Sequence, residues 1–242
     1  MRISFLASST LCAFLLGAPV AQAGWTGCHV GVMAGYVGND SKFTNLAAPP
    51  NLTGMDAKSG LTGGVEAGCD LGLPFFVVGL GASYDFLEAS KANVRSEHIG
   101  APPSTLDSTL TTRTTLGSIA AITGRVGVDI GPALLYVRAG GALAPSKMHY
   151  NYTIVHSIAG TAETDLSAKK TRSGYALGAG VEFALTSSLS VKLEYMHYDF
   201  GECNCLFSGT YSHPRIGTMP VKLLLKTEAS VDTARAGLAY RF

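Results

Sequence analysis

The residues best suited to chemistry lie close together in one stretch, "GECNCLF" at 201–207. One residue separates Cys203 from Cys205. Glu202 and His213 are near enough in sequence to contribute to a metal or haem site. The spacing matches no established zinc pattern, and one intervening residue is short for an internal disulfide. A strained or intermolecular disulfide is an alternative, but we expect two inert thiols, with no metal and no cofactor.

Sequence motifs of familiar catalytic sites do not occur in the chain, which has no G-x-S-x-G, H-E-x-x-H or Walker loop. Ser83 and Asp85 have the spacing to share one face of a strand, but no histidine can be assigned to that face to activate the serine. His149, His156 and His197 are spread over separate segments. We therefore predict no catalytic residue and do not expect an enzyme.

The first 23 residues have the composition of a secretory signal peptide. Arg2 is followed by the apolar stretch "FLASSTLCAFLLGAPV" and then by Ala21-Gln22-Ala23, an A-x-A cleavage site. The sequence thus predicts a signal peptide over 1–23 and one exported domain over 24–242. Without Arg2, basic and acidic residues are equal in number, so no nucleic-acid partner is expected.

The composition of the exported part is apolar without being helical. Charged residues make up 14% of the chain and 29 residues are glycine, yet no run of 18 apolar residues follows the signal peptide. A membrane-spanning helix is therefore excluded. A closed β-barrel remains compatible, because only helices and closed barrels satisfy every backbone hydrogen bond in lipid.

Apolar residues recur at every second position in eight segments, which is the period of a β-strand and not of a helix. In "FFVVGLGASYDF", for example, Phe76, Val78 and Leu80 share one face, and Val77 and Gly79 share the other. The predicted strands are 28–36, 61–71, 75–86, 124–130, 133–143, 174–185, 190–196 and 234–242.

The connections between these segments are alternately short and long. Turns of hairpin length occur at 72–74, 131–132 and 186–188. Long polar or irregular stretches occur at 39–60, 88–108, 145–172 and 201–222. Outer-membrane barrels have this layout, with short periplasmic turns and long external loops. We therefore predict an all-β protein, an eight-stranded antiparallel up-and-down transmembrane β-barrel of the OmpA/OmpX type, integral to the bacterial outer membrane.

The two faces of the predicted strands differ in charge. One face is apolar with Tyr and Phe near the strand ends, and the other consists of glycine, alanine and scattered charges. A soluble sandwich would bury the apolar face, whereas a barrel turns it toward lipid and encloses the charges. The glycine-rich face favours the barrel, because eight strands enclose a narrow interior. The predicted lumen charge network consists of Glu66, Asp85, Arg125, Arg138, Glu182, Lys192, Glu194 and Arg235.

Four acids and four bases make this set nearly neutral, so we expect them to pair inside the barrel. An unpaired charge there would cost several kcal/mol. Arg125, Arg138 and Arg235 are the expected hubs, because a planar guanidinium can serve two carboxylates. The network is interpreted as a structural plug, with a water-conducting path as the alternative.

The last predicted strand ends on an aromatic residue. Leu238, Tyr240 and Phe242 share its apolar face, which places the aromatic pair near the periplasmic interface. A strand finishing on Phe is similar to the terminal signal that barrel-assembly machinery reads. That machinery and the outer-membrane lipids are therefore expected partners.

The segment "WTGCHVGVMAGY" at 25–36 resembles the opening strand of the Omp25/Omp31-type outer-membrane proteins of α-proteobacteria. Gly63, Gly64, Ala67 and Gly68 match the second strand of that family, and the closing "LAYRF" is similar as well. The resemblance covers the framework strands and not the loops. It implies an eight-stranded, porin-like surface barrel, often immunogenic. Some relatives are described as binding haem and others as adhesive or structural, and none is known as an enzyme.

Two cysteines depart from the family pattern, because Cys28 and Cys69 stand where aromatic residues are usual. If Val32 faces Val65 across the first two strands, Cys28 faces Cys69 on the outward side near the oxidising periplasm. A disulfide is then possible if their Cα atoms are within about 7 Å. The alternative is two independent small residues facing lipid.

These observations favour a surface barrel with a structural or interaction role through four long external loops and an unidentified extracellular partner. A narrow porin-like channel for small solutes is the alternative. A surface protein that binds haem or another ligand is a third possibility.

Overall fold

The computed structural model describes residues 24–44, 58–87, 90–101, 104–156 and 160–242. The predicted signal peptide lies outside these residues. The described residues form ten strands: β1 (Gly27–Thr44), β2 (Lys58–Gly72), β3 (Phe76–Leu87), β4 (Ser90–Ala101), β5 (Ser104–Leu116), β6 (Ile119–Ile130), β7 (Ala133–His156), β8 (Gly160–Ala184), β9 (Leu189–His213) and β10 (Gly217–Arg241). No helix among them is long and apolar enough to cross a membrane.

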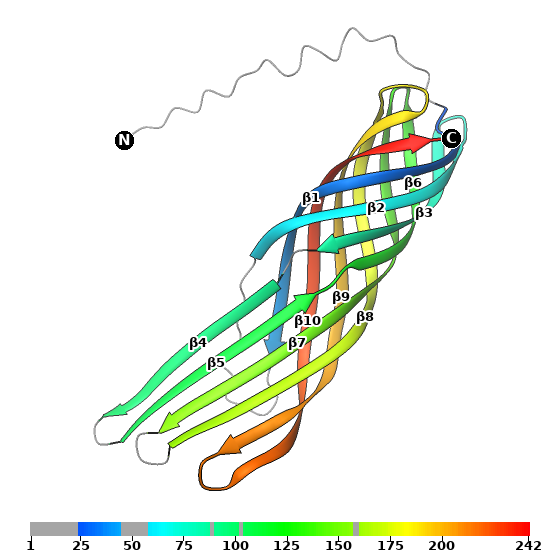
Figure 1. Ribbon diagram of the computed structural model, residues 1–242. Helices are drawn as coiled ribbons and strands as arrows, with labels where there is room; N and C mark the ends of the chain where they lie inside the picture. Colours follow the sequence, from blue (N-terminus) through cyan, green and yellow to red (C-terminus); the bar gives the residue numbers. More distant parts are fainter. Residues whose placement is uncertain (1–23, 45–57, 88–89, 102–103, 157–159) are drawn as a thin grey trace, which may run out of the picture.

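Eight of the ten strands close into a ring (Figure 1). The antiparallel order is β7-β6-β3-β2-β1-β10-β9-β8, and β8 pairs with β7 again. Closure joins the first strand to the last: Val32 lies opposite Leu238, and the Phe242 amide donates to the Cys28 carbonyl at 2.9 Å. The predicted eight-stranded antiparallel barrel is confirmed.

β4 and β5 form a hairpin outside this ring. β6 pairs with the first part of β7, up to Leu143, and β5 pairs with its continuation from Ser146 to His156. Figure 1 shows this hairpin beside the far ends of β7 and β8, at the opposite end of the molecule from the C-terminus. We call this part of the molecule, built from β4, β5 and the distal halves of β7 to β10, the extension.

The extension corrects the prediction of long irregular loops. Most of 88–108, 145–172 and 201–222 is β-strand, and β7 to β10 reach 24 or 25 residues each. Segments such as "STLTTRTTL" at 108–116 are polar but rich in β-branched threonine, which suits a pleated sheet exposed to water. Only 45–57 of the predicted loop at 39–60 lies outside the described residues.

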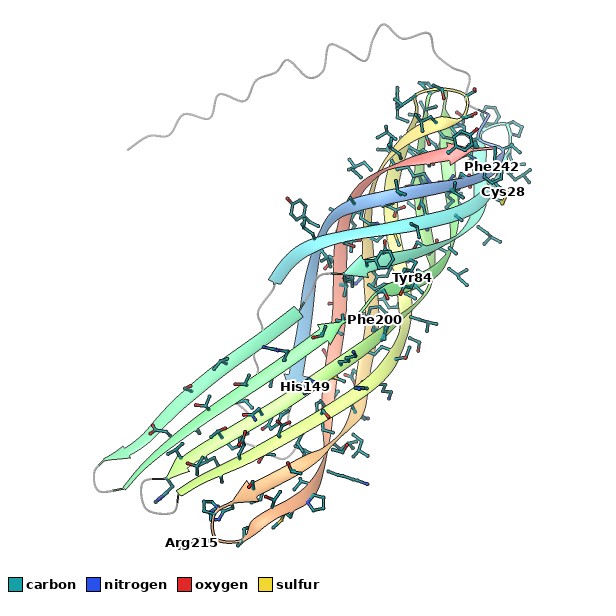
Figure 2. All side chains as sticks on the ribbon, viewed as in Figure 1. Cys28, Tyr84, His149, Phe200, Arg215 and Phe242 are labelled. Atoms are coloured by element: carbon teal, nitrogen blue, oxygen red, sulfur yellow. A yellow bond between two sulfur atoms is a disulfide. The ribbon has the colours of Figure 1, made fainter. Side chains whose placement is uncertain are left out.

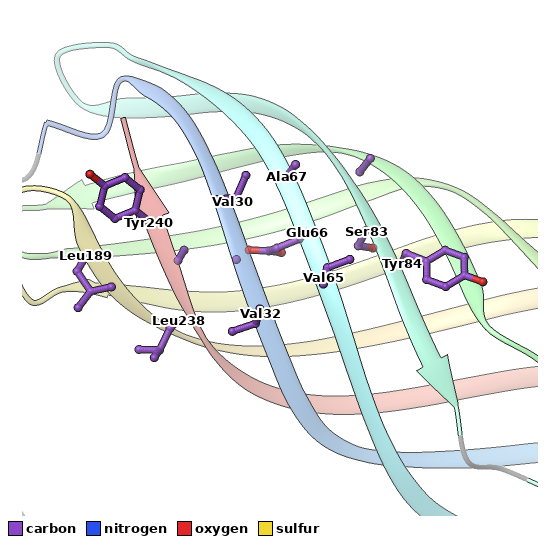
Figure 3. Close-up of a pocket in the computed structure, with 13 residues that line it drawn as sticks. Val30, Val32, Val65, Glu66, Ala67, Ser83, Tyr84, Leu189, Leu238 and Tyr240 are labelled. Atoms are coloured by element: carbon purple, nitrogen blue, oxygen red, sulfur yellow. The ribbon is translucent and has the colours of Figure 1, made fainter.

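The apolar face of the ring points outward, as predicted. Leu80 is 71% exposed and Leu193 is 59% exposed, whereas Glu182 is completely buried. In Figure 3, Val32, Val65 and Leu238 lie on the outer surface of β1, β2 and β10, where they line a shallow apolar groove. The inversion of inside and outside that distinguishes a membrane barrel from a soluble sandwich is therefore present.

Aromatic side chains border the apolar surface at both ends. The exposed aromatics at the turn end are Phe75, Phe76, Tyr240 and Phe242, and those toward the extension are Tyr36, Tyr84, Phe86, Tyr175 and Tyr195. Figure 2 shows Cys28 and Phe242 near the turn end and Arg215 at the tip of the extension. Aromatic belts of this kind mark the two interfaces of a bilayer.

The interior is filled by layers of different chemistry. At the turn end, Trp25, Val77, Leu134, Tyr136 and Ala184 form a small apolar cluster. A larger apolar layer toward the extension includes Val37, Leu116, Ile119, Met196, Tyr198, Phe200 and Val231. The sequence predicted an inner face of glycine, alanine and charges, so these bulky apolar side chains are a correction. Small inner residues make room for them: a Cβ on Gly180 would lie 2.6 Å from the Tyr136 ring.

Candidate functional site: the charged lumen

All eight predicted lumen charges are buried inside the ring, none more than 8% exposed. They come from β2, β3, β6, β7, β8, β9 and β10, at inward positions that alternate with lipid-facing residues. Because the strands are held in register by the ring, the charged groups meet near the axis of the barrel.

Arg235 and Arg138 connect the acids nearest the central apolar layer. The Arg235 guanidinium binds Asp85 with one nitrogen and Glu194 with the other. Arg138 Nη1 donates to Glu194 at 2.8 Å and to Glu66 at 3.4 Å. Glu194 therefore receives two arginines, and each arginine serves two carboxylates, as predicted for these hubs.

Lys192 and Arg125 continue the network toward the turn end. The Lys192 ammonium contacts Glu66 and lies 3.5 Å from Glu182. Arg125 donates to Glu182 at 3.0 Å and, through Nε, to Asp70 at 2.7 Å. Acids and bases thus alternate along one continuous chain of ion pairs.

Two charged members of the network, Asp70 and Arg241, were not selected from the sequence. Arg241 Nη1 donates to Asp70 at 2.8 Å, and its Nη2 donates to Glu182 at 3.3 Å. Both residues occupy the inward phase of β2 and β10, so the same alternation that placed Glu66 and Arg235 could have found them. With them, five carboxylates face five cationic side chains.

Tyrosine and histidine side chains add further contacts to the carboxylates of the network. The Tyr136 hydroxyl donates to Glu194 at 2.9 Å, and the Tyr198 hydroxyl donates to Asp85 at 3.1 Å. His29 Nδ1 lies 3.2 Å from Asp70. These aromatic and imidazole groups were missed because a lone Tyr or His on a strand carries no sequence signal for its partner.

A network of this kind is neutral and nearly dry. Each buried charge has an opposite charge within reach, which offsets the desolvation cost that an isolated ion would carry. The central apolar layer, including the buried Met196 and Phe200, lies above it in the lumen. The arrangement can hold the strands together and fill the barrel, and it exposes little polar surface to a passing solute.

The predicted opposition of Cys28 and Cys69 is present in the register of β1 and β2. The structure joins the two in a disulfide with a Cα–Cα separation of 3.9 Å. Both side chains are on the outer side of the barrel at the turn end, near Phe242 (Figure 2). The bridge fastens the first hairpin where the closing strand β10 also pairs with β1.

Cys203 and Cys205 are also joined in a disulfide, which corrects the expectation of inert thiols. Both point inward and are buried with Met148, Leu166 and Phe207. Glu202 instead contacts Lys226, and His213 lies at the end of β9. Among the described residues, no three His, Cys, Asp or Glu side chains are grouped to hold a metal ion.

Arg172 is a buried cation that the sequence did not single out. Its guanidinium binds the Thr227 hydroxyl and lies 3.4 Å from the Thr227 carbonyl and 3.8 Å from the sulfur of Met148. No ion pair of Arg172 with a carboxylate is recorded among the described residues. It lies between the central apolar layer and the interior of the extension.

The pair considered for catalysis does not assemble. Ser83 Oγ is buried and has no hydrogen-bond partner within the part of the chain that the structure describes. The Asp85 carboxylate is held by Arg235 and Tyr198 instead. That the protein is not an enzyme stays a prediction.

A closed ring of eight strands, apolar outside, charged within and bordered by aromatic belts, defines an integral β-barrel of the bacterial outer membrane. Residues 8–242 match the family described as outer membrane protein beta-barrel domain. The chain belongs to this family, and the resemblance to Omp25/Omp31-type proteins is confirmed by its relatives.

The chain is similar to the 31 kDa outer-membrane immunogenic protein of Brucella melitensis, with 29% identity over 232 residues, 93% of this chain and 87% of the relative. It is 23% identical over 221 residues to the 25 kDa outer-membrane immunogenic protein of Brucella abortus, covering 91% of this chain and 81% of that protein. Among solved structures, the outer membrane protein OprG from Pseudomonas aeruginosa aligns over 92% of this chain and 99% of its own, with 10% identity and a TM-score of 0.46.

Proposed function

We propose that this protein is a sealed surface barrel whose extension interacts with partners outside the cell. The observation that carries the proposal is the contrast between a lumen closed by a neutral ion-pair network and four strands that continue far beyond the lipid-facing surface. A membrane span needs about 9–11 residues per strand, whereas β7 to β10 have 24 or 25. The additional length supports a role outside the membrane.

Attachment assays with trimmed extensions test this role. Cross-strand partners can be joined by an Asn-Gly turn without changing the ring: Asn151 to Asp165 across β7 and β8, or Ser208 to Lys222 across β9 and β10. Bacteria displaying either trimmed barrel should lose attachment to the surfaces that bind the full-length protein. Equal attachment, at equal display and with normal heat-modifiable migration on a gel, would contradict the interaction role.

The channel alternative is tested by single-channel conductance of the refolded protein. A silent bilayer trace supports the sealed barrel, because ions would have to cross both the ion-pair network and the apolar layer. Discrete openings at neutral pH would favour the narrow channel instead. Haem capture is a further alternative, which a Soret shift on titration would support and an unchanged spectrum would oppose.

Assembly is the other partner relationship that we propose. Leu238, Tyr240 and Phe242 are all exposed on the outer face of β10, at the end of the strand that closes the ring. A terminal strand with this pattern is accessible to assembly machinery before it pairs with β1. Replacing Phe242 with Ser should slow insertion in cells more than refolding in detergent.

A further inference from the structure

Four basic side chains lie together on the outer face of the extension, next to the lipid-facing surface. Lys147 of β7 is directly opposite Lys169 of β8, and His149 of β7 is directly opposite Arg113 of β5. All four are exposed and occupy outward positions of their strands. We call Arg113, Lys147, His149 and Lys169 the basic patch.

The register of the patch is unfavourable without a counter-charge. Residues directly opposite in an antiparallel pair have their Cβ atoms about 4.5–5.5 Å apart, and like charges there repel. No ion pair of Lys147 or Lys169 is recorded among the described residues. The nearest outward acid on β8 is Asp165, four residues beyond Lys169. The arrangement is therefore one that an external anion would stabilise.

The other side of the barrel has the opposite character. Asp199, Glu202, Glu228 and Asp232 line β9 and β10, and three of these acids, Asp199, Glu202 and Asp232, have partners within the protein. Tyr175 donates to Asp199 at 3.0 Å, and Tyr195 donates to Asp232 at 2.6 Å. Lys226 hydrogen-bonds Glu202 at 2.6 Å, which lowers the pKa of that exposed carboxyl from its usual value.

The position of the patch indicates which anion it meets. Lys147 is four residues beyond Leu143, an exposed apolar residue of β7, or about 13 Å along the strand. Strand tilt reduces this height, and a lysine can extend its ammonium back toward the membrane surface. The patch therefore lies at the level of the phosphorylated sugars of the outer leaflet.

We propose that the basic patch binds the phosphates of an outer-leaflet glycolipid, lipopolysaccharide, along β5, β7 and β8. Paired lysines and Arg113 would provide charge-assisted hydrogen bonds to phosphate oxygens. Binding on this side, and not on β9 and β10, would orient the barrel among its lipids. The proposal is independent of the partner contacted by the tip of the extension.

The test is a titration of the refolded full-length mature protein, in zwitterionic detergent, with rough lipopolysaccharide. Lys147→Gln combined with Lys169→Gln should weaken binding about tenfold or more, since each basic residue near an anionic lipid surface contributes substantially. Lys226→Gln is the matched control, because this half-buried lysine is already paired with Glu202, and it should leave binding unchanged. Heat-modifiable migration verifies that every variant is folded.

Three results would overturn the proposal. The double variant could bind as tightly as the control, or dephosphorylated lipopolysaccharide could bind as tightly as the phosphorylated form, which would indicate sugar or acyl recognition. Millimolar inorganic phosphate could also displace the glycolipid completely, which would make the patch a site for free phosphate. Loss of binding with dephosphorylation, together with weak competition by inorganic phosphate, would support the proposal.

Discussion

The membrane-embedded ring and the extension share strands β7 to β10 but differ in which face of those strands carries the charges. Within the ring, β9 points Lys192 and Glu194 inward, and it points Leu193 toward lipid. In the extension the same strand points Cys205 and Phe207 inward, while Glu202 is exposed. The surroundings explain the difference, because lipid accepts apolar side chains outside the ring and water accepts charged ones outside the extension.

A change of phase on β9 accompanies this transition. Inward residues are even-numbered up to Phe200 and odd-numbered from Cys203 onward. Gly201 has a φ of +57°, and the register between β9 and β10 shifts at Glu228 and Ser230. One additional residue in a bulge is enough to exchange the two faces of a strand. A barrel of uniform register would have pointed Glu202 inward.

The largest effect is expected from breaking an ion pair inside the ring. Arg235→Met removes the cation that binds Asp85 and Glu194. Among the described residues, the Asp85 carboxylate then keeps only its hydrogen bond from the Tyr198 hydroxyl. We expect the free energy of unfolding to fall by about 3–5 kcal/mol, measured by urea titration in lipid vesicles. Adding Asp85→Asn should recover part of the loss. An unchanged stability of the single variant would contradict a dry, paired network.

The next effect is expected from opening the disulfide at the turn end. Cys28→Ser combined with Cys69→Ser removes a bridge that spans 41 residues of sequence. Loop-closure entropy then predicts a loss of about 2–4 kcal/mol. Urea titrations of the native and double-serine proteins, each with and without a reductant, would check this. Reduction also opens the Cys203–Cys205 bridge, so the two proteins should coincide only when both are reduced. A double-serine protein as stable as the native one, both oxidised, would show that the bridge does not fasten the first hairpin.

A smaller effect is expected at the bulge between the two regions. Gly201→Ala places a Cβ on a residue with positive φ, which costs about 1–2 kcal/mol. Hydrogen exchange should become faster in the distal halves of β9 and β10 and remain unchanged in the ring. Gly131→Ala, at a positive φ in the turn between β6 and β7, is the matched control and should act at the opposite end.

The smallest effect is expected from Arg172, although it too is buried, at 5% exposure against 1% for Arg235. Among the described residues, Arg172 contacts the hydroxyl and the carbonyl of Thr227 and forms no ion pair with a carboxylate. Arg172→Met therefore leaves no opposite charge unpaired. We expect a change within about 1 kcal/mol in either direction. A loss as large as that of Arg235→Met would show that burial, and not the broken ion pair, sets the cost in the ring.

The sequence predicted the ring better than the extension for a physical reason. Strict alternation of Val, Leu and Phe with Gly and charged residues identifies a strand that faces lipid, and it placed Glu66, Arg138 and Arg235 correctly. Beyond the lipid, as in β5, Ser and Thr occupy both faces, so the period is weak and the sequence predicts loops instead of strands. The bulge at Gly201 also breaks the period near Cys203.

Partners across the barrel were only partly predictable. That Arg138 would serve two carboxylates followed from its geometry, but which ones depends on register and on the stagger of the ring. The opposition of Cys28 and Cys69 needed only the first hairpin. The interior role of Cys205 and Phe207 needed the phase change on β9, which no pairwise pattern in the sequence encodes.

Fluorescence quenching by lipids with brominated acyl chains tests the inversion of inside and outside most directly. The chain has one tryptophan, Trp25, which is buried at the mouth of the lumen, so the native protein should be little quenched. A tryptophan introduced by Leu193→Trp, on the lipid-facing side of β9, should be strongly quenched. If the tryptophan of Leu193→Trp were as little quenched by the brominated lipids as Trp25, the account would be contradicted, because position 193 would then lie in a core shielded from lipid.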